Sequence, residues 1–203
     1  IAESLKVDVA DYFLISFENQ PAFATKIFID PSKRQNLIHI YHYLNHHYLD
    51  RKREFACNTL IEVIKRETGR LLDVERFIRL TLFDALIGNH DRHGRNLALI
   101  ETPSGKALSP FYDNHSYLAI EDENLLAAKH SPRGKITTST SPEPTLADYT
   151  YEFRTLGYGE IVEQFRALVD IEHITTLIED RFISRKRKAA LQQLVTERAI
   201  ERN

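Results

Sequence analysis

The chain has 203 residues, of which 42% are apolar and 28% charged, and its formal net charge is −2. These values are typical of a globular protein, no apolar run reaches the roughly 18 residues that a membrane-spanning helix needs, and the balanced charge does not favour direct binding to nucleic acid. The single cysteine, Cys57, cannot form an internal disulfide, which predicts a buried thiol in a cytoplasmic protein.

The first thirty residues predict the end of a helix followed by a β-hairpin. Residues 1–5 fit a last helical turn. Two runs rich in aromatic and β-branched residues, 12–17 and 22–29, surround a short polar turn. Asp30 and Pro31 end the second run.

Apolar residues at helical spacing then predict three helices before residue 88. The first covers about 33–48, the second about 54–67 with Gly69 as its stop, and the third 73–87 with Asp73 as N-cap and Gly88 as C-terminal glycine. The first carries His39, His42, His46, His47 and Asp50. Two of these histidines are four residues apart, as zinc ligands on one helix face are, but an ordinary polar helix surface is the interpretation that we favour.

The loop 88–96 follows the third predicted helix and leads into a predicted hairpin with strands at 97–100 and 107–113. Residues 120–149 are rich in Ser, Thr, Pro and charge, so we expect an irregular segment. Within it, the segment 131–141, which contains Thr137–Thr140, is either an activation loop or an ordinary surface loop. Apolar spacing predicts further helices from about residue 161, and the basic run Arg185–Lys188 predicts a solvated helix face.

Three polar residues of this hairpin unit suggest chemistry. Asp91 and Asn96 have the Asp-x-x-x-x-Asn spacing of a kinase catalytic loop, and Asp113 follows the second strand. A carboxylate beside an acceptor hydroxyl and two oxygen ligands for Mg²⁺ are what phosphoryl transfer requires. On spacing alone, a polar turn capped by Asp91 and Asn96 remains an equal alternative.

The segments 86–96 and 108–114 resemble the HipA-type serine/threonine kinases, the toxin kinases of bacterial toxin–antitoxin systems. The shared patterns are Ile-Gly-x-x-Asp-x-His-x-x-Asn and a later Pro-x-Tyr-Asp. The resemblance implies an α+β, mainly α-helical fold: a protein-kinase-like C-lobe with a short β-hairpin carrying the active site and a small β remnant of the N-lobe. Residues 1–32 would be the end of the N-lobe and the hinge, and 33–203 the helical C-lobe.

The same resemblance implies roles for individual residues and partners. Asp91 matches the catalytic base, and the metal ligands for Mg²⁺ are Asn96 and Asp113. The ATP-binding residues are Lys26, Phe28, His93, Gly94, Arg95, Asn96, Tyr112 and Asp113. The reaction implied is ATP-dependent phosphorylation of a protein substrate, such as an aminoacyl-tRNA synthetase or another translation factor, and a DNA-binding antitoxin is implied as partner.

Two departures leave alternatives open. No phosphate-binding loop or strand lysine is visible in the sequence. Either the chain is truncated, which we favour, or the missing part lies on another chain, or this is an inactive kinase-like binding or regulatory module. The letters Asp91-Arg92-His93-x-x-Asn96 also resemble the loop of phosphoinositide kinases. Pro110-x-Tyr112-Asp113 and the short chain favour the HipA type over that enzyme.

Overall fold

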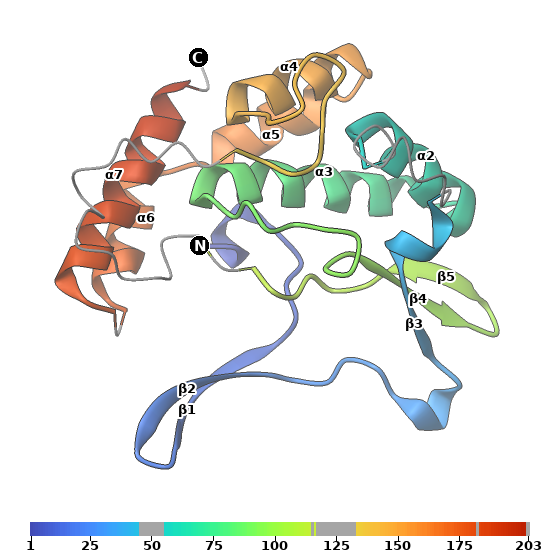
Figure 1. The fold of residues 1–203 in the computed structure, drawn as a ribbon, viewed down its shortest axis with the longest axis horizontal. Coiled ribbons are helices and arrows are strands. Elements are labelled where there is room, and N and C mark those ends of the chain that lie inside the picture. Colours follow the sequence, from blue (N-terminus) through green and yellow to red (C-terminus); the bar gives the residue numbers. More distant parts are fainter. Residues whose placement is uncertain (45–54, 115, 117–132, 182, 202–203) are drawn as a thin grey trace.

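The computed structural model describes residues 1–44, 55–114, 116, 133–181 and 183–201. Helices form the body of the molecule, and two small sheets lie on one side of it (Figure 1). The predicted α+β, mainly helical class is therefore confirmed. Within the described ranges, no helix is both long enough and apolar enough to cross a membrane.

Helix α3 (Leu71–Ile87) is the centre of the core. It is buried on nearly all sides, as expected for a helix with apolar residues around its circumference. Gly88 ends it in a left-handed conformation, with φ of 72°, as the sequence predicted. The predicted N-cap was wrong: Arg70 caps the helix, and Asp73 lies buried in the first turn, where it pairs with Arg76 at 3.0 Å.

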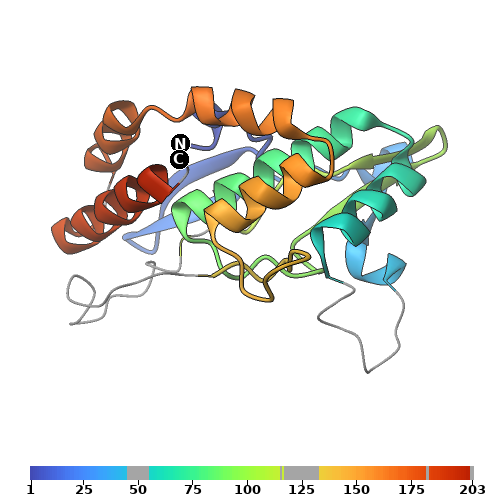
Figure 2. The same ribbon diagram turned by 90° about the horizontal axis from the view of Figure 1, so that it is seen from above.

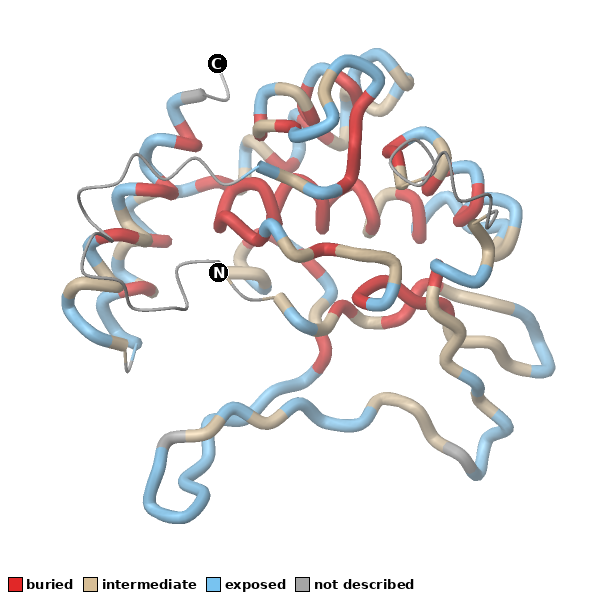
Figure 3. Tube along the Cα trace, viewed as in Figure 1, coloured by how far each residue is buried: buried red, intermediate tan, exposed pale blue. Residues whose placement is uncertain are grey.

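The N-terminal segment forms a hairpin that projects from the body. After the short 3₁₀ helix η1 (Glu3–Leu5), strand β1 (Tyr12–Phe17) pairs antiparallel with β2 (Gln20–Thr25). Glu18 and Asn19 both have positive φ, the requirement of a tight two-residue hairpin turn. The predicted hairpin is thus confirmed, and every residue of β1 is exposed (Figure 3).

The second sheet corrects the predicted helix at 33–48. After the 3₁₀ turn η2 (Pro31–Lys33), residues Asn36–His39 form strand β3, which pairs with β4 (Ala98–Thr102), and β4 pairs with β5 (Gly105–Leu108). The 3₁₀ helix η3 (Ile40–Tyr43) follows. The apolar residues at helical spacing serve strand pairing instead, because cross-strand contacts with β4 override the local pattern.

The predicted histidine-bearing helix is therefore absent in the described residues. His39 ends β3 and His42 lies in η3, while His46, His47 and Asp50 lie outside the described residues. Within the described part of the chain, no group of three or more His, Cys, Asp or Glu side chains could hold a metal ion.

Four of the remaining helices pack against α3 (Figure 2). They are α2 (Cys57–Thr68), α4 (Leu146–Thr155), α5 (Gly159–Leu168) and α7 (Arg185–Glu201). The fifth, α6 (Ile171–Glu179), packs against α7. Cys57 is buried at the start of α2, as predicted. The prediction of an irregular segment up to residue 149 missed the start of α4, although Thr145 and Asp148 form a capping box there.

Candidate active site

A buried charge network fixes the loop that follows α3. Arg92 donates to both carboxylate oxygens of Asp84, at 2.7 and 3.0 Å, and both side chains are almost completely buried. Asn89 donates to the same carboxylate at 2.9 Å and accepts a hydrogen bond from the backbone N–H of Asp91 at 3.0 Å. The network therefore sets the backbone position of Asp91 from the last turn of α3.

Arg92 also joins this loop to the segment after β5. Its guanidinium donates to the carbonyl oxygens of Asn96 and Tyr112, at 3.0 and 2.9 Å, and to the side-chain oxygen of Asn114 at 2.5 Å. Together with the two bonds to Asp84, these contacts match the five N–H donors of an arginine. Arg92 thus holds its own loop to residues that lie 20 and 22 positions further along the chain.

Asn96 is the point at which the three predicted residues meet. Its Nδ2 donates to the Asp113 carboxylate at 2.8 Å and to the backbone carbonyl of Asp91 at 3.2 Å. Asn96 is buried, whereas Asp113 is exposed and the Asp91 side chain is 38% exposed. The carboxylates of Asp91 and Asp113 are therefore accessible to a substrate, whereas the side chain of Asn96, which bonds to both residues, is buried.

Asp113 has a backbone conformation that few residues adopt. Its φ is 56°, in the left-handed region, which costs most residues about 1 kcal/mol and Asp or Asn less. The preceding backbone is fixed, because Phe111 donates to the carbonyl of Asp8 and accepts from the N–H of Ala10, both at 2.8 Å. Strained backbone that the surrounding structure enforces is frequent at functional sites.

The chemistry of Asn96 and Asp113 fits Mg²⁺. An amide oxygen and a carboxylate are hard oxygen donors, and Mg²⁺ commonly takes only one or two protein ligands, with substrate phosphates and water completing its shell. Asn96 and Asp113 would hold the ion together, because their side chains lie within 2.8 Å of each other.

Tyr112 forms the other end of the site. Its hydroxyl donates to the carbonyl of Arg95 at 2.8 Å and lies 3.2 Å from Nδ1 of His39, while its ring lies 5.8 Å from that of Phe28. Burial raises the pKa of Tyr112 to about 12, so the phenol is neutral at physiological pH. Two aromatic rings this close together form an apolar surface against which the flat ring of a nucleotide base can pack.

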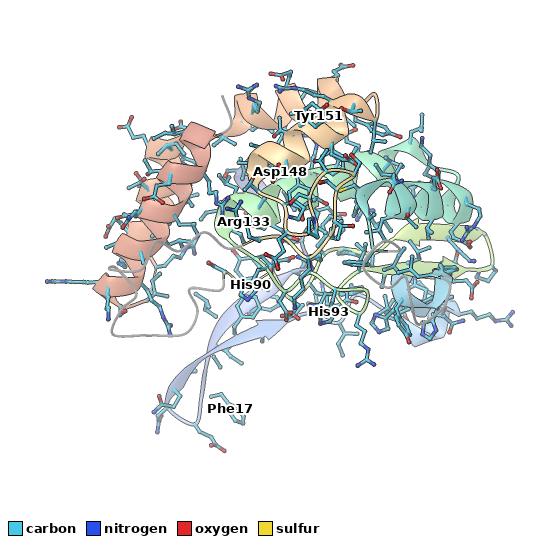
Figure 4. The ribbon with its side chains drawn as sticks, turned by 45° about the horizontal axis from the view of Figure 1, so that its top comes forward. Phe17, His90, His93, Arg133, Asp148 and Tyr151 are labelled. Atoms are coloured by element: carbon cyan, nitrogen blue, oxygen red, sulfur yellow. The ribbon has the colours of Figure 1, made fainter. Side chains whose placement is uncertain are left out.

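The other predicted site residues lie on two segments: His93, Gly94 and Arg95 on the loop after α3, and Lys26 directly after β2. Nδ1 of His93 accepts from the N–H of Arg95 at 3.2 Å, and the carbonyl of Gly94 accepts from the N–H of Tyr41 at 3.1 Å. A Cβ at Gly94 would lie 3.1 Å from the Cβ of Tyr41, so the close approach favours glycine. Figure 4 shows His90 and His93 on the loop between the helices and the hairpin β1–β2. Lys26 lies on the hairpin side, where it pairs with Asp11 at 3.4 Å.

Three residues that shape this site were not predicted from the sequence. Asp84 carried a usable signal, because a carboxylate within the apolar run 82–87 requires a buried partner. Arg92 is adjacent to Asp91, yet the sequence does not show that its side chain turns inward. Lys135, whose Nζ donates to Oδ1 of Asp91 at 2.5 Å, comes from 44 residues away and has no sequence signal.

Comparison with solved structures defines the class of fold. The Helicobacter pylori proinflammatory kinase CtkA matches with a TM-score of 0.77 and 18% identity, covering 99% of this chain and 80% of CtkA. HipA of Shewanella oneidensis, solved in a toxin–antitoxin complex with HipB and operator DNA, matches with a TM-score of 0.66 and 16% identity, covering 98% and 52% of the two chains. The chain therefore has the predicted kinase-like fold.

Sequence comparison defines the family. The model of the HipA-like C-terminal domain matches residues 1–170, and the chain belongs to this family. A Sinorhizobium fredii protein named "Putative kinase Y4dM" is 35% identical over 123 residues. That match covers 53% of this chain and 29% of Y4dM, so the chain spans less than a third of the length of this curated relative.

Proposed function

We propose that this chain is the catalytic lobe of an ATP-dependent protein kinase that transfers the terminal phosphoryl group to a Ser or Thr hydroxyl. The observation that carries the proposal is the contact of Asn96 with both Asp113 and Asp91. Membership of the HipA-like family favours this activity over the phosphoinositide-kinase alternative.

Each residue has a role that follows from its position. Asp91 accepts the proton of the acceptor hydroxyl, because its carboxylate is partly exposed on a backbone held by Asn89. Asn96 and Asp113 would hold Mg²⁺ against the phosphates, and the ion would supply charge stabilisation during transfer. The rings of Tyr112 and Phe28 contact the adenine base of ATP, next to the backbone of residues 24–28. Residues His93–Arg95 lie between the adenine and the metal ligands.

The finer proposal concerns the biological context. A translation factor, such as an aminoacyl-tRNA synthetase, is the proposed substrate, and a DNA-binding antitoxin the proposed partner. The partner is supported by the Shewanella HipA structure, which contains HipB and operator DNA. The single buried thiol of Cys57 agrees with a reducing compartment, and we place the protein in the cytoplasm.

Calorimetric titration of the full-length protein with ATP and Mg²⁺ tests the metal site. Asn96→Ala removes one oxygen ligand, and Asp113→Asn removes one charge. Asparagine tolerates the left-handed backbone of residue 113. We expect the affinity for ATP in the presence of Mg²⁺ to fall about tenfold or more in each variant, from the loss of a charged contact. Without Mg²⁺ the difference from the wild type should largely disappear.

Two exposed residues provide matched controls. Asn58→Ala, on α2, and Asp180→Asn, at the end of α6, make the same chemical changes outside the loops of the site, and both should leave the titration unchanged. Wild-type affinity in Asn96→Ala and Asp113→Asn would contradict the metal assignment. A wild-type protein that binds no ATP and phosphorylates nothing would support the binding or regulatory module instead.

A further inference from the structure

Lys135 contacts the carboxylate that the proposed function makes the catalytic base. Its Nζ lies 2.5 Å from Oδ1 of Asp91, and the two side chains are 49% and 38% exposed. Ion pairs this exposed contribute little to stability, because solvent screens the two charges. Stabilisation of the fold is therefore a weak reason for a lysine to be placed at this position.

The backbone on either side of Lys135 is fixed by its surroundings. The N–H of Gly134 donates to the carbonyl of Pro144 at 2.9 Å, and the buried Tyr149 donates its hydroxyl to the carbonyl of Ile136 at 2.6 Å. Thr137 bonds to the start of α2 through two backbone contacts of 2.9 Å, one with Phe55 and one with Cys57. These bonds set where the lysine side chain begins.

Gly134 adds a steric constraint to this placement. A Cβ at Gly134 would lie 1.8 Å from the hydroxyl oxygen of Tyr149, far inside van der Waals contact. Only a residue without a side chain allows the segment to pass so close to α4. The path that carries Lys135 to Asp91 is thus specified by the chain itself and is not an accident of a surface loop.

The charges around Asp91 show which cation can reach the phosphate. Arg92 is the neighbour of Asp91 in sequence, but its five N–H donors all bond within the protein. A lysine carries three N–H donors on a flexible stem, and Lys135 is half exposed. A group that bonds to Asp91 also lies within a few ångströms of the reacting phosphorus, because base, hydroxyl and phosphorus are in contact during transfer.

We propose that Lys135 is a catalytic residue that moves from Asp91 to the terminal phosphoryl group when ATP binds. This inference rests on the proposed function and deepens it. In the free protein the lysine neutralises Asp91. In the complex its ammonium group donates to the non-bridging oxygens of the γ-phosphate and leaves Asp91 open to the acceptor hydroxyl.

The transfer step then balances without a further reactant. The hydroxyl oxygen of the substrate forms a bond to the γ-phosphorus, and the bond from that phosphorus to the β,γ-bridging oxygen breaks. ADP leaves with the electron pair, and the hydroxyl proton passes to the carboxylate of Asp91. Lys135 keeps its protons throughout and stabilises the charge on the transferring group.

Lys135→Ala and Lys135→Arg in the full-length protein test the proposal, with the rate of autophosphorylation or substrate phosphorylation as the first readout. We expect kcat to fall ~10²-fold or more in Lys135→Ala, the usual effect of losing one donor to a transition-state charge. Lys135→Arg should recover part of that loss. An unchanged or higher rate in Lys135→Ala would overturn the proposal, since a lysine that only blocks Asp91 would increase activity when removed.

Nucleotide affinity provides a readout that does not depend on turnover. Calorimetry should show that Lys135→Ala binds ATP about tenfold more weakly, because one charged hydrogen bond is lost. Binding of ADP, which lacks the γ-phosphate, should stay within about twofold of the wild type. Equal losses for both nucleotides, or none for either, would contradict a contact with the γ-phosphate.

A second lysine–carboxylate pair supplies the control. Lys106, in β5, lies 2.8 Å from Glu67 at the end of α2, and Lys106→Ala removes a lysine–carboxylate pair outside the loops that carry Asp91 and Asp113. It should leave kcat and the ratio of ATP to ADP affinity unchanged. If Lys135→Ala matches the wild type while Asp91→Asn is inactive, this inference fails and the proposed function stands. If the wild type itself neither binds nor uses ATP, the proposed function fails as well.

Discussion

The loop between α3 and β4 has two sides of opposite character. On the inner side, Asn89 and Arg92 are almost fully buried and bond to the buried Asp84 of α3, and Arg92 also bonds to backbone carbonyls. The outer side carries Asp91 and, from the next loop, Asp113, both reachable by solvent. The buried charges on the inner side therefore determine the shape of the loop, while the charges on the outer side are available for chemistry.

Asp91→Asn gives the largest expected effect and acts on the outer side alone. The amide keeps the shape of the side chain but cannot accept the hydroxyl proton, so the rate of phosphoryl transfer should fall at least about 10²-fold. The midpoint of chemical denaturation should stay near that of the wild type, because the side chain is partly exposed. Unchanged phosphorylation would remove Asp91 from the role of base.

Arg92→Ala tests the inner side and should mainly affect stability. It leaves the Asp84 carboxylate buried without its cation, which typically lowers the free energy of unfolding by about 3 to 5 kcal/mol. Urea denaturation of the full-length protein measures this loss. Arg92→Lys keeps the charge but offers only three donors, so we expect an intermediate stability.

Arg92→Lys tests the role of the inner side even if Arg92→Ala does not fold. Arg92→Lys should also weaken binding of ATP with Mg²⁺, because the loops of Asn96 and Tyr112 lose a common anchor. Wild-type stability and wild-type affinity in Arg92→Lys would show that the five-bond arrangement is not needed to hold the site.

Tyr112→Phe gives the smallest expected effect, and it changes a residue that is only partly buried. Loss of the bond to Arg95 should lower the free energy of unfolding by about 1 kcal/mol at neutral pH. The pKa of Tyr112 is raised from 10.0 to about 12, so the stabilisation from the neutral phenol is complete below pH 10 and is lost as the pH rises through 12. The gap between wild type and variant should therefore shrink over that range. A gap that stays constant from pH 9 to 12 would contradict the burial of the phenol.

Local patterns predicted the parts of the fold that depend on local rules. The hairpin turn at Glu18 and Asn19, the glycine stop at Gly88 and the apolar face of α3 are read directly from residue type and spacing. The predicted helix at 33–48 failed because β3 exists only through its partner β4, which lies about sixty residues further along the chain. The missed start of α4 is different, since its capping box is visible in the sequence.

The candidate site divides in the same way. Asp91, Asn96 and Asp113 were predicted by a motif, and the structure places them in one group, although their catalytic roles remain predictions. The residues that support them could not be derived from spacing. The bond from Arg92 to Asp84 depends on how the loop turns back onto α3, and Lys135 reaches Asp91 only because Gly134 passes against Tyr149.

The projecting hairpin gives the proposed nucleotide site one end that is much less protected than the other. A ribbon of only two strands is marginally stable by itself, and the exposed side chains of β1 contribute little burial. Its backbone amides should therefore exchange with solvent through frequent local opening, whereas those of α3 open only with the whole protein. Phe28 follows this ribbon, so the adenine of ATP would contact a segment that becomes ordered when the nucleotide binds. The phosphates would contact groups that Arg92 already fixes.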